Sequence, residues 1–379
     1  MYSGAEAVFA EVCLGLHRAG VDLGFLLPAE AGELRERLRP ALDTGAPVIG
    51  VPAQSGRFAA PGLYRPAVLL KLRRAIRHLG AGALLVNLPS AELGGRALLA
   101  RRRGRPPAVG LMHIHQSLAD SGFVLGALRD RLAAPAIRRC DRVLVVSPTG
   151  GPSTAKQWRL DRQHVKRLPL PRAHVSLMDR GAARSALGID TEDGPVVALI
   201  GRLSIKQKGH DVLLAAAPQV LARRPDALFL LVGSGADRAA LEHQIAANGI
   251  QDRVRLTGPV VDVSTTLAAV DAVVFPSRFE GLPLGALEAL EAGRPGIVSA
   301  VDGLASLWPE SWQVPPDNPT MLAHALLELL DEPPSSIART LEHARARATA
   351  LTDPDPAVTA LDALSEVAPA VAPRLGVGT

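Results

Sequence analysis

Two cations in the second half of the chain have the spacing of groups that hold an anionic ligand. Arg202 and Lys208 both follow a predicted strand at 196–200 and precede a helix that is expected to begin near His210. Cations on a loop at a strand end suit a diphosphate, which carries about two negative charges and needs neutralising as it leaves. The alternative is that Arg202 and Lys208 are solvated surface cations. Lys206, which lies between them in the sequence, is expected to be a solvated cation.

Glu280 and Glu288 lie eight residues apart around a predicted helix start. Pro283 suits the first position of a helix, so Glu280 is expected in the preceding loop and Glu288 in the second helical turn. Free N–H groups at a helix start bind hydroxyl or phosphate oxygens, and carboxylates accept hydrogen bonds from sugar hydroxyls. In a purely structural alternative, Glu280 interacts with the helix dipole and Glu288 is a solvated helix residue.

A glycine turn follows the next predicted strand, at 227–232. Gly233 and Gly235 flank Ser234 just before a predicted helix, where backbone N–H groups are able to bind an anion. The turn lacks the third glycine of a dinucleotide-binding fingerprint, and a tight turn without a ligand explains it equally well. The complete G-x-G-x-x-G of a nicotinamide- or flavin-dependent oxidoreductase is therefore absent here, and that class is not indicated.

These residues need a parallel sheet to position them, because ligands of open α/β sheets bind beyond the carboxyl ends of the strands. Short apolar runs alternate with amphipathic stretches along the whole chain, which predicts βα units. The strands expected in the second half are 196–200, 227–232, 253–256, 272–275 and 296–299, with helices at 211–223, 236–248, 263–269, 283–292 and 321–330. The first half is expected to hold helices at 5–19 and 69–79 and strands at 21–27, 83–88, 109–114 and 142–146.

The composition is that of a globular protein of two domains. The 379 residues are 47% hydrophobic and 21% charged, which excludes global disorder. Cys13 and Cys140 stand far apart without metal-ligand spacing, so neither a disulfide framework nor a structural zinc site is indicated. No apolar run approaches the roughly 18 residues of a membrane span, and no signal-peptide pattern opens the chain. We expect a reduced, cytoplasmic protein.

The net charge of +5 hides a strong asymmetry. Residues 1–180 hold 27 Lys and Arg against 13 Asp and Glu, a net +14, whereas residues 181–379 hold 15 against 24, a net −9. A basic half attracts nucleic acid, an anionic membrane surface or a phosphorylated substrate, and an arginine-rich surface without a partner is the alternative. Nucleic acid is disfavoured, because the aromatic residues are scattered and no helix-turn-helix pattern appears.

Taken together, these segments resemble the donor domain of retaining glycosyltransferases of the GT-B fold, specifically family 4. The resemblance covers residues 194–332 strongly and the first half more loosely. The segments that carry it are Gly201-Arg202, Lys208-Gly209, Gly233-Ser234-Gly235, Val254-Arg-Leu-Thr-Gly258, Asp271-Ala-Val-Val-Phe-Pro-Ser277 and Glu280 with Glu288-Ala289. The resemblance implies an α/β fold of two Rossmann-like, doubly wound domains that face a cleft. An acceptor-side domain is expected at 1–180, a nucleotide-sugar donor domain at 181–350, and a last helix and loose tail at 351–379.

The resemblance assigns donor contacts residue by residue. Arg202 and Lys208 are expected to hold the diphosphate, Glu288 the ribose and Glu280 the transferred sugar. Further contacts, several through the backbone to the base and sugar, are implied for Gly201, Gly233, Gly235, Thr257, Gly258, Val260, Gly281 and Leu282.

The first half adds Gly4 and His115 to the expected site. Gly4 lies in Ser3-Gly4-Ala5-Glu6, which resembles the family's glycine loop, although Ser3 and Glu6 also form a helix capping box. The family often places a functional histidine after the strand expected at 109–114. His115 matches that position better than His113 does. The alternative is that either one is a structural histidine. Family members open with a strand before the glycine loop, so the first strand of this domain is expected to be missing and Met1 is suspected to be a wrong or trimmed start.

The implied reaction moves a sugar from a nucleotide-diphosphate sugar to an acceptor hydroxyl with retention of anomeric configuration. No metal or cofactor is implied, because no Asp-x-Asp stands at a strand end. The acceptor is a glycan, a lipid-linked compound or a small molecule. Two stretches are basic, Leu69–Leu79 and Arg101–Arg105. They are consistent with a peripheral contact with the cytoplasmic face of a membrane. The alternative is that they are solvated surface without a partner. A pseudoenzyme that binds sugar nucleotides is the alternative function.

Overall fold

The computed structural model describes residues 4–28, 31–51, 64–89, 94–102, 106–189, 194–260 and 262–371. These residues form two compact units. The first unit comprises the described parts of Tyr2–Pro171 and Thr352–Thr379, and the second unit is Arg172–Leu351. The chain therefore divides at residue 171 rather than near 180, and its last helix belongs to the first unit rather than to a separate tail.

The second unit contains a six-stranded parallel sheet with the strand order β12-β11-β10-β7-β8-β9. The strands are β7 (Val196–Ile200), β8 (Leu228–Val232), β9 (Val254–Gly258), β10 (Ala272–Phe275), β11 (Gly296–Ser299) and β12 (Gln313–Val314). β7, β8, β10 and β11 are buried along their whole length. Continuous apolar runs of this kind are typical of parallel strands that are covered on both faces.

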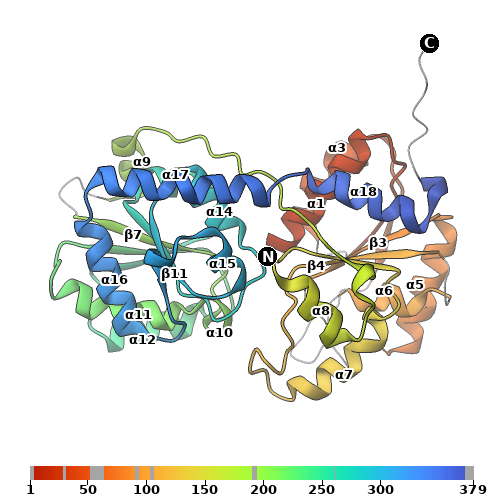
Figure 1. Cartoon of the computed structure of the whole chain (residues 1–379), viewed down its shortest axis with the longest axis horizontal. Helices are drawn as coiled ribbons and strands as arrows, with labels where there is room; N and C mark the ends of the chain where they lie inside the picture. The colour runs from red at the N-terminus through yellow and green to blue at the C-terminus, as the bar shows by residue number, and fades with distance from the viewer. Residues whose placement is uncertain are drawn as a thin grey trace, which may run out of the picture. The chain divides into compact units, whose positions relative to one another are not determined.

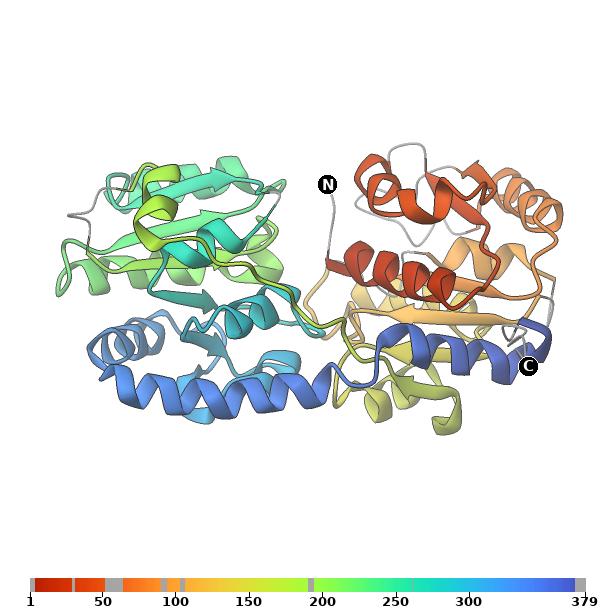
Figure 2. The ribbon, with the colours of Figure 1, turned by 90° about the horizontal axis from the view of Figure 1, so that it is seen from above.

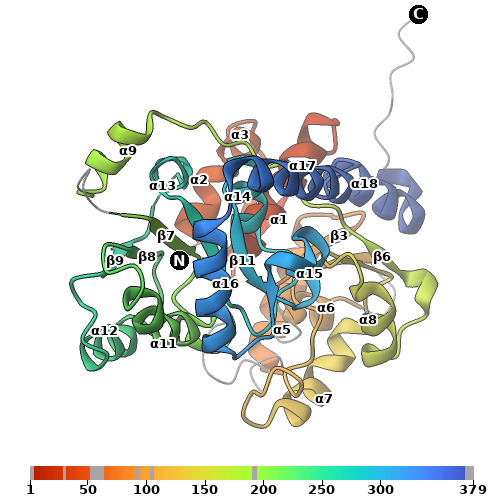
Figure 3. The same ribbon diagram turned by 60° about the vertical axis from the view of Figure 1, so that its left-hand side comes forward.

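Helices cover both faces of this sheet, because each crossover between parallel strands must traverse a face. Figures 1 and 3 show α11, α12 and α16 on one side of the strands and α14 and α17 on the other. The helices are α9 (Arg180–Ala186), α10 (Ile205–Lys208), α11 (His210–Leu221), α12 (Arg238–Ala247), α13 (Ser264–Ala269), α14 (Leu284–Glu291), α15 (Asp302–Leu307), α16 (Pro319–Asp331) and α17 (Pro334–Leu351). The unit is doubly wound, as the sequence predicts.

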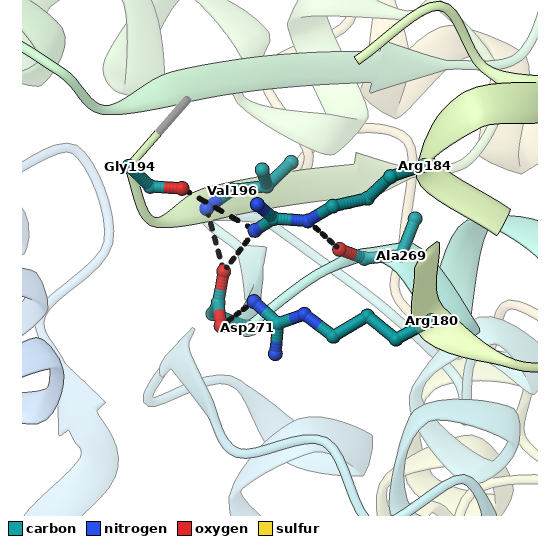
Figure 4. A network of polar contacts seen from close by, with 6 residues as sticks. All are labelled: Arg180, Arg184, Gly194, Val196, Ala269 and Asp271. Atoms are coloured by element: carbon teal, nitrogen blue, oxygen red, sulfur yellow. Dashed lines mark hydrogen bonds and ion pairs between the residues drawn. The ribbon is translucent and has the colours of Figure 1, made fainter. Parts of the chain in front are cut away.

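An ionic network fixes α9 to the sheet of the second unit (Figure 4). The two oxygens of Asp271 lie 2.5 Å from Nη2 of Arg180 and 3.0 Å from Nη2 of Arg184. Arg184 also donates to the carbonyls of Ala269 and Gly194, at 3.2 and 3.3 Å. The segment before β7 thus contains a helix that is bound to the second unit.

The first unit holds two parallel sheets. β3 (Leu84–Leu88), β4 (Ala108–Met112), β5 (Arg142–Val145) and β6 (Val165–Arg167) pair in sequence order, and β1 (Phe25–Pro28) pairs only with β2 (Val48–Val51). Among the described residues, no strand joins β1 to β3. β1 is shorter than the strand predicted at 21–27, because its pairing with β2 begins only at Phe25.

Helix α18 (Pro356–Val367) packs along α1 (Gly4–Arg18) in the first unit (Figures 1 and 2). Gly15 permits this contact, since a Cβ there would lie 2.2 Å from the Cβ of Ala357. The other helices of the unit are α2 (Gly32–Arg37), α3 (Arg39–Leu42), α5 (Pro66–His78), α6 (Gly95–Ala100), α7 (Gly126–Ile137) and α8 (Gly150–Trp158). Helix α18 lies within 351–379, where the sequence indicates a last helix.

Candidate active site

The strand order of the second unit brings two distant loops together. β7 and β10 are neighbours in the sheet. The chain continues from β7 toward β8 and β9, and from β10 toward β11 and β12, so the strand order reverses between them. Ligands of open α/β sheets bind at the carboxyl ends of strands at such a reversal. The loop after β7 carries Arg202 and Lys208, and the loop after β10 carries Glu280.

Lys208 and Glu280 form a buried ion pair. Nζ of Lys208 lies 2.5 Å from Oε1 of Glu280, and their side chains are only 13% and 6% exposed. The hydroxyl of Ser277 donates to the same carboxylate oxygen at 2.9 Å. The sequence predicts separate contacts of Lys208 with a diphosphate and of Glu280 with a sugar, whereas the structure places both groups at one point. An ammonium group has three protons, so Lys208 has donors beyond the one that Glu280 accepts.

Gln207 links Arg202 to this ion pair. Its amide oxygen accepts a hydrogen bond from Nη2 of Arg202 at 2.9 Å, and its amide nitrogen lies 3.5 Å from Oε2 of Glu280. Gln207 is buried, whereas Arg202 is exposed. Sequence reasoning missed Gln207, and it named Ser277 only as the end of a segment that carries the family resemblance, without a role. The position of Gln207, one residue before Lys208, is the signal that the sequence offers for it.

Arg278 and Asp237 hold the short helix α10, and with it Lys208. Nη1 of Arg278 donates to the carbonyl of Ile205 at 2.6 Å, and Oδ2 of Asp237 accepts from the N–H of Ile205 at 2.7 Å. Arg278 also forms a bidentate pair with Asp211, at 3.0 and 2.7 Å. The hydrogen bond to Asp211 raises the pKa of Arg278 above its usual value. The loop after β7 is thus connected to the loop after β10 by fixed charge pairs.

Two glycines allow the strand-end loops to approach this closely. A Cβ on Gly209, whose φ is +65°, would lie 2.0 Å from the carbonyl oxygen of Pro276. A Cβ on Gly233 would lie 2.0 Å from the carbonyl oxygen of Gly201, and Gly235 is equally confined. Close backbone contact between loops therefore accounts for the glycine turn at Gly233 and Gly235, which is the structural alternative that the sequence left open.

Gly281 and Leu282 lie between β10 and α14, and both are buried. Within the described part of the chain, neither backbone N–H donates a hydrogen bond. Pro283 is the N-cap of α14 rather than its first residue as predicted, because its ψ of 129° is extended. Glu288 is still in the second turn, where it is half-buried. Unsatisfied N–H groups before a helix are suited to bind oxygen atoms of a ligand.

The segment predicted to lie against the base is placed at the end of β9. Thr257 and Gly258 are the last two residues of that strand, not a turn after it, and Val260 follows in an irregular segment. The Thr257 side chain is exposed, and its Oγ1 lies 3.2 Å from the carbonyl oxygen of Gly258. That carbonyl accepts a hydrogen bond from the N–H of Gly233 at 2.9 Å, which connects β9 to the glycine turn.

In the first unit, His115 follows the carboxyl end of β4. It is 6% exposed, and a Cβ on Gly150 would lie 2.9 Å from its Cγ, so the start of α8 packs against the imidazole ring. His113 has its Nε2 at 2.7 Å from Oδ1 of Asn87, and burial lowers the pKa of His113 to about 3. Gly4 is the exposed first residue of α1, whereas Ser3 lies outside the described residues.

Over the described ranges, no group of three or more His, Cys, Asp or Glu side chains is placed to hold a metal ion. No helix in the same ranges is long and apolar enough to cross a membrane. Cys13 and Cys140 are buried free thiols, and burial raises the pKa of each to about 12.

Known families match both units of the chain. The family described as glycosyl transferases group 1 matches residues 194–332, and the one described as glycosyltransferase family 4 matches residues 2–171. The alpha-D-kanosaminyltransferase of Streptomyces kanamyceticus is 30% identical over 314 residues, which is 76% of this chain and 79% of that protein. The chain belongs to glycosyltransferase family 4. A GDP-mannose-dependent monoacylated alpha-(1-6)-phosphatidylinositol monomannoside mannosyltransferase from Corynebacterium glutamicum is 36% identical to this glycosyltransferase over 42% of its own length.

Solved structures of other glycosyltransferases share this fold. Anabaena Alr3699/HepE, in complex with UDP and glucose, superposes with a TM-score of 0.73 at 21% identity, over 96% of this chain and 95% of that one. WaaG, a glycosyltransferase involved in lipopolysaccharide biosynthesis, superposes with a TM-score of 0.69 at 17% identity, over 97% and 96%. The predicted GT-B fold of this family 4 glycosyltransferase is therefore confirmed.

Proposed function

We propose that this glycosyltransferase moves a sugar from a nucleotide-diphosphate sugar to an acceptor hydroxyl, with retention of anomeric configuration and without a metal ion or other cofactor. The observation that carries the proposal is the Lys208–Glu280 ion pair, linked through Gln207 to Arg202 at the carboxyl ends of β7 and β10. It combines cations for a diphosphate with a carboxylate for sugar hydroxyls. The HepE complex with UDP and glucose supports the same ligand class.

Arg202 and Lys208 would contact the donor diphosphate. Arg202 is exposed, so its guanidinium group is accessible to phosphate oxygens, while Gln207 limits its movement. Glu280 would accept hydrogen bonds from the transferred sugar, and the N–H groups of Gly281 and Leu282 would add donors beside it. Buried N–H groups that lack partners gain free energy when a ligand oxygen accepts from them.

The remaining predicted contacts would complete the binding site of the donor. Glu288 would hold the ribose hydroxyls, and the backbone around Thr257, Gly258 and Val260 would line the base. His115, on the first unit, would position the sugar or the acceptor. Gly4, Gly201, Gly233 and Gly235 would act through backbone approach rather than through side chains.

In the proposed reaction, the bond from the anomeric carbon to the diphosphate oxygen breaks as the acceptor oxygen bonds to the same face of that carbon. The acceptor hydroxyl transfers its proton to an oxygen of the departing diphosphate. Arg202 and Lys208 would stabilise the negative charge that develops on the leaving group. Cations that are positioned before the reaction need no reorganisation in the transition state.

The proposed acceptor is a glycan, a lipid-linked compound or a small molecule, with no role for nucleic acid. The first unit would approach a membrane peripherally on its cytoplasmic face. Helix α5 supports this part of the proposal, because Lys71, Arg74 and Arg77 are exposed on it. Each Lys or Arg near an anionic surface contributes about 1 kcal/mol of attraction.

A panel of UDP-, GDP- and dTDP-sugars tests the proposal, with nucleotide release as the readout, in the presence and absence of acceptors and anionic vesicles. We expect release from one donor class in buffer with EDTA, and loss of release in Arg202→Ala. Proton NMR of the first product from an α-linked donor should show the α anomer. Binding of the donor without any release would instead identify a pseudoenzyme, and a β anomer would exclude retention.

A further inference from the structure

A groove lined by arginines lies in the first unit, at the amino ends of its strands. Its volume is about 830 Å³, and it is lined by the end of α5, the segments before β3 and β4, the end of α6 and the last residue of α18. Four cations, Arg73, Arg77, Arg101 and Arg102, line it, and none of its described lining residues is Asp or Glu. β4 separates the groove from His115 by about 16 Å, at roughly 3.3 Å per residue. The groove is therefore separate from a site at the carboxyl ends of these strands.

The two inner arginines are fixed by backbone carbonyls. Nε of Arg73 donates to the carbonyl of Ala100 at 2.9 Å, and Nη1 of Arg101 donates to that of Pro106 at 2.6 Å. Arg101 also pairs with Asp141 at 3.0 Å, and its side chain is 3% exposed. Nε of Arg101 nevertheless has no acceptor among the described residues. The carbonyls of Ala100, at the end of α6, and of Pro106, before β4, thus explain why these two arginines are present, but they leave one buried donor unused.

The two outer arginines have no such explanation. Arg77 and Arg102 are exposed, and in the described ranges no hydrogen bond or ion pair engages either side chain. Glu366, the acidic residue next to the groove on α18, is instead 3.0 Å from Arg142 and is also paired with Lys166. Like charges that are not compensated repel one another and attract an anion to the space between them.

We propose that this groove binds a phosphate-bearing ligand through Arg77 and Arg102, with Arg101 at its inner wall. The planar guanidinium group donates two parallel hydrogen bonds to phosphate oxygens, which makes arginine the favoured partner for that group. Leu70 and Ile76 line the same groove, and Leu70 is 53% exposed, so an apolar part of the ligand has a surface to contact. The volume lies within the range of small-molecule sites, about 300–1,000 Å³. The phosphate belongs either to a lipid headgroup or to a free phosphorylated compound.

Titration calorimetry of the full chain with inorganic pyrophosphate tests this site. We expect two classes of site in the unmodified protein, one at the groove and one at Arg202. Arg77→Ala with Arg102→Ala should weaken the first class about 100-fold, since each charge-assisted contact contributes about tenfold. Arg202→Ala should remove only the second class, so that failure of the proposed donor site does not affect the result for the groove.

The matched control is Lys156→Ala with Arg162→Ala. Both residues lie in the first unit, are exposed and remove the same charge, but they do not line the groove. Sedimentation with phosphatidylcholine vesicles that contain phosphatidylglycerol identifies the source of the phosphate. Vesicle binding that only the groove variant loses indicates a lipid headgroup, and pyrophosphate binding without vesicle binding indicates a free compound. Equal weakening by both double variants, or no binding at all, would overturn the proposal.

Discussion

The two units hold their cations in opposite ways. In the second unit, Lys208 is paired with a buried carboxylate, and hydrogen bonds continue from that carboxylate through Gln207 to Arg202. In the first unit, Arg77 and Arg102 line a groove without a partner in the described ranges. The half of the sequence that holds Lys208 carries a net −9, and the half that holds the groove carries +14.

Net charge is therefore a poor guide to the position of a binding cation. In the acidic half, Glu280 determines where the Lys208 ammonium group lies before any ligand arrives. Such preorganisation suits a site where negative charge develops during a reaction. In the basic half, the cations are uncompensated, which suits binding of a permanent anion. The following experiments test this distinction.

Lys208→Ala should have the largest effect. It removes a cation from the donor site and leaves Glu280 buried without its ammonium partner. We expect the transfer rate to fall roughly 100-fold or more, and the folded state to lose about 3 kcal/mol. Steady-state kinetics and urea unfolding measure the two effects. Lys206→Ala on the same helix is the control and should change both by little. Near-normal turnover in Lys208→Ala would remove this residue from the site.

The network around Asp271 separates a buried cation from an exposed one. The Arg184 side chain is 9% exposed and the Arg180 side chain 47% exposed. Arg184→Ala should destabilise the protein by about 3 kcal/mol, because it leaves buried polar groups unpaired. Arg180→Ala should cost less than about 1 kcal/mol, as expected of an exposed ion pair. Urea unfolding compares them, and equal losses would contradict the structural role assigned to Arg184.

Gln207→Leu keeps the side-chain size but removes the link between Arg202 and Glu280. We expect about a tenfold loss of kcat/KM, the effect of losing a hydrogen bond to a charged group. The loss should appear mainly in KM for the donor, since the cations themselves remain. Gln251→Leu, at an exposed turn, is the control. An unchanged KM would show that Arg202 is positioned without Gln207.

Acid should destabilise both units, because each unit contains a buried histidine whose pKa is lowered by burial. Burial lowers the pKa of His113 to about 3 and that of His210 to about 4, against 6.5 for the ordinary group. Below about pH 6.5 the unfolded chain binds protons that the folded chain does not, so stability is present above that pH and decreases toward pH 4. At pH 5.5 we expect about 1 kcal/mol lost for each histidine. Urea unfolding of His210→Leu should show a flatter pH dependence than the unmodified chain, and an unchanged slope would contradict this origin.

Much of the fold is predictable because apolar runs are local features. The strands at 196–200, 272–275 and 296–299 have the bounds that the sequence indicates. Helix α10 was not predicted, because four residues are too few to show a helical period. The boundary at residue 171 was missed because α9 lies within the polar stretch between Pro171 and Pro195 and is held by Asp271, about 90 residues away in the sequence.

The candidate site was predictable in its residue types but not in its contacts. Strand-end positions and the family resemblance indicate Arg202, Lys208 and Glu280. The ion pair between Lys208 and Glu280 depends on β7 lying beside β10 in the sheet. The local sequence pattern does not specify which strands are neighbours. Gln207 carries no charge, so nothing in its type or spacing distinguishes it from a surface residue.

Calorimetric binding of the donor's nucleoside diphosphate tests the central claim most directly. The unmodified chain, Arg202→Ala, and Arg77→Ala with Arg102→Ala are titrated under the same conditions. We predict that Arg202→Ala weakens binding at one class of site about tenfold or more, the value of one charge-assisted contact, and that the groove variant leaves this class unchanged. Unchanged binding at every site in Arg202→Ala, or loss of this same class in the groove variant, would contradict the assignment of the donor site to the ends of β7 and β10.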